Sequence, residues 1–355
     1  MDAPDTIAEE AAALERAADW DGARATYSRA FAAARARGAV RAMVEATRGG
    51  ARMLRELGRL DEAAEQADLS CEMAARCGLP REAARAANVL GTILYVGGAI
   101  HEAADLYERA LEWAREVRDD ELIGLVCANL GVVANIRGNF SVAFTYYLES
   151  IAAAVRTGNV QASVLGYNNL GMLASDVREW MQADLLLHRA LEMAEELGDA
   201  TFTTTLLLNR VEPLIQVGEL DAAQEVLDRA EEMAERIQNV RELSEASRFR
   251  GLLARRRGDE TAATGYLARS LLLATRAGLR LERAEALEQI ALQHRDAGRA
   301  DAARTHLAEA SAEFFAAGAT RDCARCRELL SAWAPPGDGE DPGGTVPALR
   351  IVGAA

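Results

Sequence analysis

The sequence contains no lysine, so all 40 of its basic residues are arginine. Against 55 aspartate and glutamate residues they leave a net charge of −15 over 355 residues. A surface of this average sign repels a phosphate backbone, which argues against a general nucleic-acid or anionic-membrane binder. Every cationic contact is left to a planar guanidinium that can bind a carboxylate through two hydrogen bonds.

Aromatic residues are also scarce, at 5%, whereas half of the residues are apolar and alanine dominates. A core of alanine and leucine suits closely packed helices better than sheets. No run of about 18 uncharged apolar residues is present, so no membrane span is expected. The acidic start "MDAPDTIAEE" does not resemble a signal peptide. The five cysteines are an odd number and scattered, which indicates reduced thiols and a cytoplasmic location.

The sequence shows no catalytic constellation. There is no glycine-rich phosphate loop and no Gly-x-Ser-x-Gly elbow, and no two of the four histidines have metal-ligand spacing on one helix. We therefore predict no enzymatic activity and no cofactor. Cys323 and Cys326, with His294 and His306 nearby in sequence, could form a four-ligand zinc site. The alternative, which we favour, is that both cysteines pack as small hydrophobes, so no metal is expected.

A forty-residue repeat is the main positive feature. Alanine recurs at eight positions spaced by forty: Ala23, Ala63, Ala103, Ala143, Ala183, Ala223, Ala263 and Ala303. Glycine lies five residues earlier in six of the eight repeats, Ala18 and Arg178 being the exceptions. A second glycine series also has two exceptions, Arg118 and Gln238; its members are Gly38, Gly78, Gly158, Gly198, Gly278 and Gly318. Such regularity indicates repeated structural units within one chain.

Each unit is predicted to be a pair of helices. The small residues let a neighbouring helix approach closely, and the glycines fit left-handed helix ends. We expect first helices near 6–17, 40–57, 80–97, 120–137, 160–177, 200–217, 240–257 and 280–297. We expect second helices near 20–37, 61–77, 101–117, 141–157, 180–197, 221–237, 261–277 and 301–317. Pro213 falls inside a first helix and is expected to kink it.

Three segments resemble tetratricopeptide repeats: "NVLGTILYVGGAIHEAADLYERAL", "ANLGVVANIRGNFSVAFTYYLESI" and "NNLGMLASDVREWMQADLLLHRAL". The family pattern is Leu-Gly in the first helix, a turn glycine, then alanine, an aromatic residue and alanine. The sixth repeat departs from it, with Arg210 and Val211 in place of Leu-Gly.

The resemblance implies an all-α fold, a right-handed α-α superhelix of about eight helical hairpins. The solenoid is expected over 1–333, with a capping helix at 319–333 and a disordered Pro/Gly-rich tail at 334–355. The predicted repeats are 1–38, 39–78, 79–118, 119–158, 159–198, 199–238, 239–278 and 279–318.

The resemblance also implies a ligand-binding groove lined by first helices. Its candidate residues are Arg48, Arg52, Arg55, Arg85, Asn88, Tyr95, Asn129, Val132, Asn135, Ile136, Asn168, Asn169, Met172, Arg248 and Arg255. Arginines lie toward both ends of the set and favour an acidic ligand or a free carboxylate. Two alternatives stay open. The arginines could instead pair with nearby glutamates, and the series Asn129, Asn169 and Asn209, spaced by forty, could tie neighbouring helices together.

We predict a non-enzymatic scaffold or adaptor that binds a peptide or protein segment in this groove. The alternative is a detached regulatory or sensory module acting in trans on a transcription factor, kinase or signalling ATPase. No nucleic acid or membrane is expected as a partner. A further hypothesis is that the tail segment "VPALRIV", 346–352, occupies the groove as an internal ligand.

Overall fold

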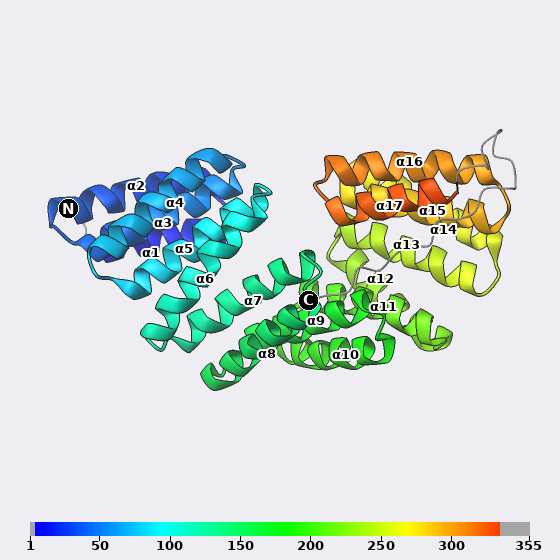
Figure 1. Ribbon diagram of the computed structural model, residues 1–355, viewed down its shortest axis with the longest axis horizontal. Helices are drawn as coiled ribbons and strands as arrows, with labels where there is room; N and C mark the ends of the chain where they lie inside the picture. The colour runs from blue at the N-terminus through cyan, green and yellow to red at the C-terminus, as the bar shows by residue number, and fades with distance from the viewer. Residues whose placement is uncertain (1–3, 334–355) are drawn as a thin grey trace, which may run out of the picture. The chain divides into compact units, whose positions relative to one another are not determined.

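The computed structural model describes residues 4–333, which form seventeen α-helices and no strand (Figure 1). The first helices of eight consecutive hairpins are α1 (Pro4–Arg16), α3 (Val40–Glu56), α5 (Pro80–Val96), α7 (Asp120–Ile136), α9 (Val160–Asp176), α11 (Ala200–Val217), α13 (Val240–Arg256) and α15 (Arg280–Asp296). The second helices are α2 (Trp20–Ala36), α4 (Leu60–Arg76), α6 (Ile100–Glu116), α8 (Phe140–Thr157), α10 (Trp180–Leu197), α12 (Leu220–Arg236), α14 (Glu260–Ala277) and α16 (Ala300–Ala316).

Helix α17 (Thr320–Ala332) follows the last hairpin and packs on α16. The expectation of an all-α solenoid of helical hairpins is therefore confirmed, and the predicted helix ends agree to within about two residues. Among the described residues no helix is long and apolar enough to cross a membrane. The predictions for the tail 334–355, including its role as an internal ligand, lie outside the described residues.

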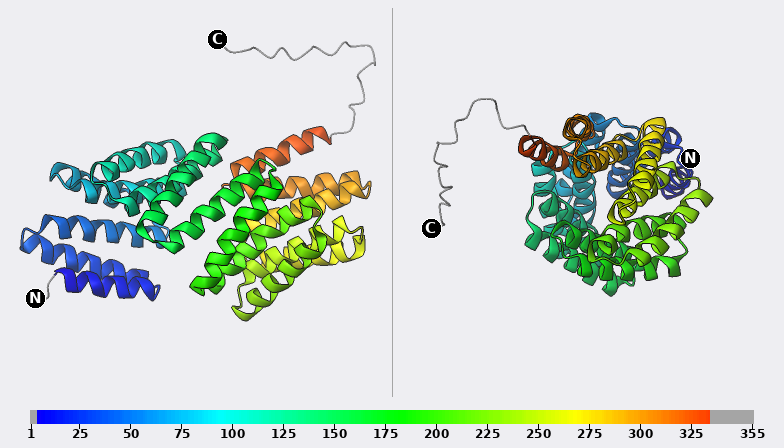
Figure 2. Two further views of the ribbon diagram at one scale, coloured as in Figure 1. Left: turned by 90° about the horizontal axis from the view of Figure 1, so that it is seen from below. Right: turned by 90° about the vertical axis from the view of Figure 1, so that its right-hand side faces the viewer.

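The chain divides into two compact units, one reaching to Glu242 and the other starting at Leu243. Consecutive helices pack against each other within each unit, and Figure 2 shows these neighbours from two further directions. In the first unit the first helices of adjacent hairpins also touch, α1 with α3, α3 with α5, α5 with α7, α7 with α9 and α9 with α11. They form one continuous layer, which we call the first-helix layer of this unit.

The repeated alanines lie where helices meet. All eight members of the alanine series are 0% exposed. The Leu-Gly signature has a matching role, because its glycine faces a large side chain on the second helix of the same hairpin. A Cβ atom on Gly131 would lie 2.4 Å from the ring of Tyr147, and one on Gly251 would lie 2.6 Å from Leu267. The absence of a side chain at these glycines therefore sets the distance between the two helices.

The turns keep a left-handed conformation even where glycine is missing. Gly158 ends α8 with φ 67°, as a left-handed helix end requires. The four exceptions in the glycine series have the same backbone, with φ 56° at Ala18, 55° at Arg118, 63° at Arg178 and 53° at Gln238. An L-residue in this region is disfavoured by about 1–2 kcal/mol. Packing of the flanking helices therefore imposes the turn on these residues.

The irregular sixth hairpin is accommodated by a side-chain partner. Arg210 Nε donates a hydrogen bond of 2.8 Å to Asp184 Oδ1 on α10, and the Arg210 side chain is only 12% exposed. The charge that replaces the family's leucine is therefore paired. Helix α11 continues without a break from Ala200 to Val217, with Pro213 buried inside it.

Replacing Arg178 by glycine is expected to raise the free energy of unfolding by up to about 1 kcal/mol, because the left-handed strain is relieved. Urea unfolding of the intact chain measures this. The matched control is Gly158→Ala, which introduces the same strain with no atom within 4 Å to complicate it, and it should lower stability. A loss of stability in Arg178→Gly would show that this turn is not strained.

Two glycines of one hairpin should respond oppositely to alanine. Gly251→Ala forces Leu267 to move and should destabilise by about 1–3 kcal/mol. Gly265 is exposed on α14 with nothing within 4 Å of a built Cβ, so Gly265→Ala should stabilise by about 0.5–1 kcal/mol. Thermal and urea unfolding of both variants test the packing argument, which equal effects of the two substitutions would contradict.

Candidate ligand-binding site

Four of the predicted residues line one cavity in the first-helix layer. The cavity has a volume of about 260 Å³ and is lined by Arg48, Arg52, Arg85, Asn88, Val89, Glu121, Leu122 and Leu125. We call it the arginine pocket. It joins side chains from α3, α5 and α7, so three successive repeats contribute to it. Val89, Glu121, Leu122 and Leu125 are not among the candidate residues named in the sequence analysis.

Arg52 is held by side chains from the first hairpin. Its Nη2 atom lies 2.7 Å from Glu15 Oε1 and 2.9 Å from Glu15 Oε2. The Tyr27 hydroxyl donates to the same carboxylate. Burial and the Glu15 carboxylate together raise the pKa of Tyr27 to about 12. The charge of Arg52 is therefore already balanced within the fold.

Arg48 and Arg85 differ from Arg52 in lacking a side-chain partner. Neither forms a hydrogen bond or ion pair with another described residue, and the Nη1 atom of Arg48 is shielded from solvent. Burial first, then the positive charges of Arg85 and Arg52, lower the pKa of Arg48 to about 10, although Glu45 and Glu82 act in the opposite direction. Arg48 and Arg85 therefore lack a direct ion-pair partner in the arginine pocket, although the Glu121 carboxylate also lines it.

The asparagines mostly bond to each other. Asn129 Nδ2 donates to Asn88 Oδ1 at 2.8 Å, and Asn209 Nδ2 donates to Asn168 Oδ1 at 2.9 Å. Each bond joins the first helices of adjacent repeats, so the helix-tying role considered from the sequence applies to Asn129 and Asn209. Asn169 belongs to the same series and is half-buried, but forms no hydrogen bond within the described part of the chain.

Asn135 is also engaged within the fold. Its Nδ2 atom donates a 2.9 Å hydrogen bond to Asp176 Oδ2. Its Oδ1 atom is shielded from solvent and accepts no hydrogen bond from the described residues. Asn135 therefore retains one acceptor that a ligand could use.

The apolar candidates divide into core and surface. Val132 packs against the core around Tyr147. Tyr95 is half-buried, and this burial raises the pKa of its hydroxyl. Ile136 and Met172 are 39% and 40% exposed, so they present apolar surface to a ligand.

A second cavity of about 220 Å³ lies between α7, α8 and α9, and we call it the α7–α9 pocket. It is lined by Asp120, Glu121, Gly124, Leu125, Ala128, Ser150, Ala154, Thr157, Asn159, Gln161, Ala162 and Leu165. Glu121 and Leu125 line both cavities, so the α7–α9 pocket adjoins the arginine pocket.

The remaining arginine candidates have acidic partners. Arg55 pairs with the adjacent Glu56 in the first unit. In the second unit Arg248 Nε lies 3.2 Å from Glu285 Oε2. Arg255 Nε lies 3.6 Å from Asp296 Oδ2. Pairing with nearby acidic residues, the alternative considered from the sequence, therefore describes these three side chains. A single groove with arginines at both ends stays a prediction.

Comparison with known proteins bears on the fold. No protein-family model and no curated protein matches the chain. Solved structures do. The apo form of RapI matches with a TM-score of 0.66 and 12% identity, covering 81% of this chain and 99% of RapI. A signal transduction ATPase with a tetratricopeptide repeat sensor from Pyrococcus horikoshii matches with a TM-score of 0.63 and 17% identity, covering 76% of this chain and 41% of the ATPase.

A third structure is the Rap conjugation gene regulator of plasmid pLS20 in complex with the Phr* peptide. It matches with a TM-score of 0.50 and 17% identity, covering 75% of this chain and 72% of the regulator. This chain has a tetratricopeptide-type repeat fold. At these identities the likeness concerns the fold alone.

The zinc arrangement considered from the sequence is not formed in the last tetratricopeptide-type hairpin. Cys323 and Cys326 are buried in the core with Phe314. His294 and His306 stack on each other with ring centroids 5.3 Å apart. Among the described residues no group of three or more His, Cys, Asp or Glu side chains is placed to hold a metal ion. The two cysteines therefore act as packing residues.

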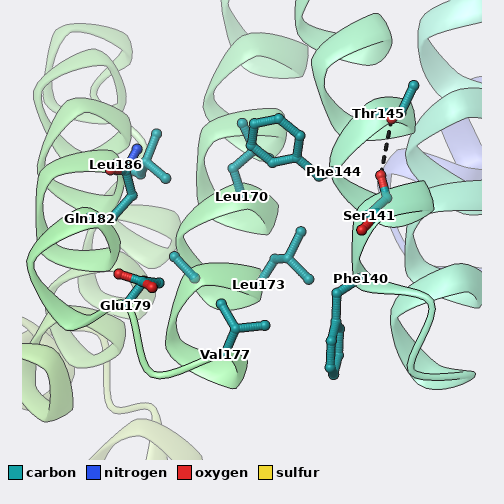
Figure 3. Close-up of a pocket in the computed structure, with 11 residues that line it drawn as sticks. Phe140, Ser141, Phe144, Thr145, Leu170, Leu173, Val177, Glu179, Gln182 and Leu186 are labelled. Atoms are coloured by element: carbon teal, nitrogen blue, oxygen red, sulfur yellow. Dashed lines mark hydrogen bonds between the residues drawn. The ribbon is translucent and has the colours of Figure 1, made fainter.

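A cavity larger than the arginine pocket was not predicted. It lies between α8, α9 and α10 of the fourth and fifth repeats and has a volume of about 570 Å³ (Figure 3). It is lined by Phe140, Ser141, Phe144, Thr145, Leu170, Leu173, Ala174, Val177, Glu179, Gln182 and Leu186. We call it the hairpin 4–5 cleft. None of the predicted site residues lines it. The sequence signal for it is an apolar residue on the outer face of a second helix, because Phe144 lines the cleft and is 48% exposed.

Arg48 and Arg52 should differ in their effect on stability. The lowered pKa of Arg48 means that the fold disfavours its charge by about 3 kcal/mol at every pH below about 10, where Arg48 is charged in both folded and unfolded chains. Arg48→Met should therefore raise the free energy of unfolding by roughly 1–3 kcal/mol. Arg52→Met should lower it by about 1 kcal/mol, because Glu15 loses its partner. Urea unfolding at neutral pH compares them, and destabilisation by Arg48→Met would contradict the charge argument.

Proposed function

We propose that this protein is a non-enzymatic scaffold that binds a peptide or protein segment on the first-helix layer of its first unit. The observation that carries the proposal is the arginine pocket, where Arg48 and Arg85 have no partner. Leu125, 52% exposed at the edge of this pocket, adds apolar surface next to the charge. A site that combines a few convergent polar groups with apolar surface is typical of ligand recognition.

The chemistry of the pocket supports an acidic ligand or a free carboxylate. Guanidinium groups bind carboxylates through two parallel hydrogen bonds, and such bonds are about twice as strong as neutral ones. The half-buried pocket reduces screening by solvent. The same ligand would also remove the unfavourable charge burial at Arg48.

The similar structures support a polypeptide ligand. The pLS20 conjugation regulator is described in complex with the Phr* peptide. We extend to this chain only the idea that the fold can accept a peptide. The regulatory module acting in trans is not favoured by these findings. Action in the cytoplasm is part of the proposal and is supported by the five cysteines, all of which are free thiols.

The test is a pull-down from lysate of the source organism with three baits. The first is the unmodified protein. The second carries Arg48→Met, Arg85→Met and Leu125→Asp in the first-helix layer. The third is a matched control with Phe144→Ser and Leu185→Ser on the second helices α8 and α10, where both side chains are exposed. Circular dichroism and thermal unfolding establish that all three are folded.

We expect a protein or peptide that binds the unmodified bait and the control but binds the second bait at least about tenfold more weakly. Titration calorimetry with the identified partner measures the change in affinity. Equal binding to the first two baits, with loss in the control, would move the binding surface to the hairpin 4–5 cleft and contradict the proposal.

A further inference from the structure

An acidic surface formed by second helices is interrupted at the hairpin 4–5 cleft. Three outward positions of each repeat lie two residues before, two residues after and five residues after the buried alanine. On α4, α6 and α12 they hold acidic side chains apart from His101: Asp61, Glu65, Asp68, Asp105, Glu108, Asp221, Glu225 and Asp228. On α8 and α10 they hold no acidic side chain: Ser141, Thr145, Leu148, Met181, Leu185 and His188. All these residues are exposed, so the difference lies on the surface.

Apolar side chains take the place of the acids around the cleft. Phe144 and Leu148 on α8 are 48% and 45% exposed, and Met181 and Leu185 on α10 are 80% and 64% exposed. We call these four residues the α8–α10 patch. Phe144 lines the cleft, and the other three lie within one helical turn of a lining residue (Figure 3). Exposed apolar side chains gathered in this way mark interaction sites.

The helices on either side of the patch are placed by ion pairs. Arg115 on α6 bonds Glu149 on α8 at 2.8 Å, and Arg229 on α12 bonds Glu195 on α10 at 2.5 Å. Helix α6 therefore lies beside α8, and α12 lies beside α10. Their outward acids border the patch on both sides, and we call four of them the acidic frame: Asp105, Glu108, Glu225 and Asp228.

The chain contains a second cleft of the same kind that is acidic. It has a volume of about 440 Å³ and lies between α2, α3 and α4 of hairpins 1 and 2. Its lining residues include Glu62, Glu65 and Gln66. Three repeats later the same positions hold Gln182, Leu185 and Leu186. Packing of the hairpins thus tolerates glutamate at these positions, so it does not explain the exposed Leu185.

The shape of the cleft fits a helix. Its walls are α8 and α10 and its floor is α9, where Leu170 and Val177 are two turns apart, or about 10 Å. The backbone groups of these walls are used within their own helices. A helix satisfies its own backbone hydrogen bonds, whereas an extended segment would leave its own unpaired against such walls. An amphipathic helix laid into an apolar groove is a common mode of recognition.

The charge around the cleft selects a basic partner. The acidic frame flanks the patch, and Glu179 lines the cleft itself with an exposed carboxylate. A second copy of this chain, with its own net charge of −15, would bring a second acidic frame against the first. A helix with basic residues beside its apolar face has the complementary charge.

We propose that the hairpin 4–5 cleft binds an amphipathic α-helix of a partner protein. Apolar side chains from about two turns of that helix enter the cleft and contact Phe144 and Leu185. Arginine or lysine residues on its flanks face Glu179 and the acidic frame. The site lies on second helices, apart from the arginine pocket, and the inference does not rest on the proposed function.

The experiment uses a library of stapled helices of about 18 residues with randomised outward positions. Three full-length proteins are used for affinity selection. The first is unmodified. The second carries Leu148→Asp and Leu185→Glu, the residue types that α4 has at these positions. The third is the matched control, with Gly265→Glu and Ala268→Asp at the same repeat positions of α14, where both residues are exposed.

We expect a class of helices that the first and third proteins enrich and the second does not. These helices should combine an apolar face with arginine or lysine beside it. In fluorescence anisotropy the second protein should bind them at least about tenfold more weakly, and the control within about twofold. Added acids alone would strengthen the binding of a basic helix, so this loss separates apolar contact from general charge attraction.

The acidic frame is tested by Asp105→Asn with Glu225→Gln. This variant should bind the selected helices about threefold more weakly at low salt, and the difference should vanish in about 0.5 M NaCl. An unchanged affinity at low salt would contradict the charge complementarity from which the basic partner is inferred.

The inference is wrong if no helix follows this enrichment pattern, or if the enriched helices are acidic or lack an apolar face. Sedimentation equilibrium tests the other occupant. A dimer of the unmodified chain that Leu148→Asp with Leu185→Glu converts to a monomer would assign the cleft to a second copy and overturn the inference. None of these results affects the arginine pocket, whose partner is identified by loss from the bait carrying Arg48→Met, Arg85→Met and Leu125→Asp.

Discussion

The whole architecture depends on the close approach of helices at side chains that are small or absent. Eight alanines spaced by forty residues are fully buried at these contacts, and the glycines of the Leu-Gly signature let Tyr147 and its equivalents lie directly against the first helix. A methyl group at Gly131 would meet the Tyr147 ring at 2.4 Å. Because these contacts recur at a fixed spacing, 16 residues from Gly131 to Tyr147 and from Gly251 to Leu267, the hairpins repeat one geometry. Positions outside this pattern are free to vary.

That freedom explains how a protein with 40 arginines and no lysine distributes its positive charge. Most arginines among the groove candidates form ion pairs with carboxylates of the same chain, as Arg52 does with Glu15 and Arg248 with Glu285. Such pairs contribute little net stability where they are exposed. Arg48 and Arg85 stand apart because neither forms an ion pair or hydrogen bond with a described residue, although Glu121 lines the same pocket. The unfavourable burial of Arg48 is tolerated where a ligand could supply the missing negative charge, a usual trade of stability for function.

Hydrogen bonds between asparagines join first helices across repeats. Asn129 donates to Asn88 and so joins α7 to α5, and Asn209 donates to Asn168 and so joins α11 to α9. Each bond satisfies part of the hydrogen-bonding capacity of two amides. The same repeat positions carry other residues elsewhere, such as Arg48 on α3 and Ala128 on α7, so the bond is not formed in every repeat.

The sequence by itself determined the helices, their ends to within about two residues, and the left-handed turns, because these follow from a local period of forty and from helix periodicity. It also placed Arg48, Arg52, Arg85 and Asn88 on one surface. Only the tertiary structure decided which of these side chains keep unused hydrogen-bonding groups. Glu15 reaches Arg52 across 37 residues, and Asn129 reaches Asn88 across 41. Such pairings depend on the residues that neighbouring repeats happen to carry and on how their side chains are oriented, which no local pattern encodes.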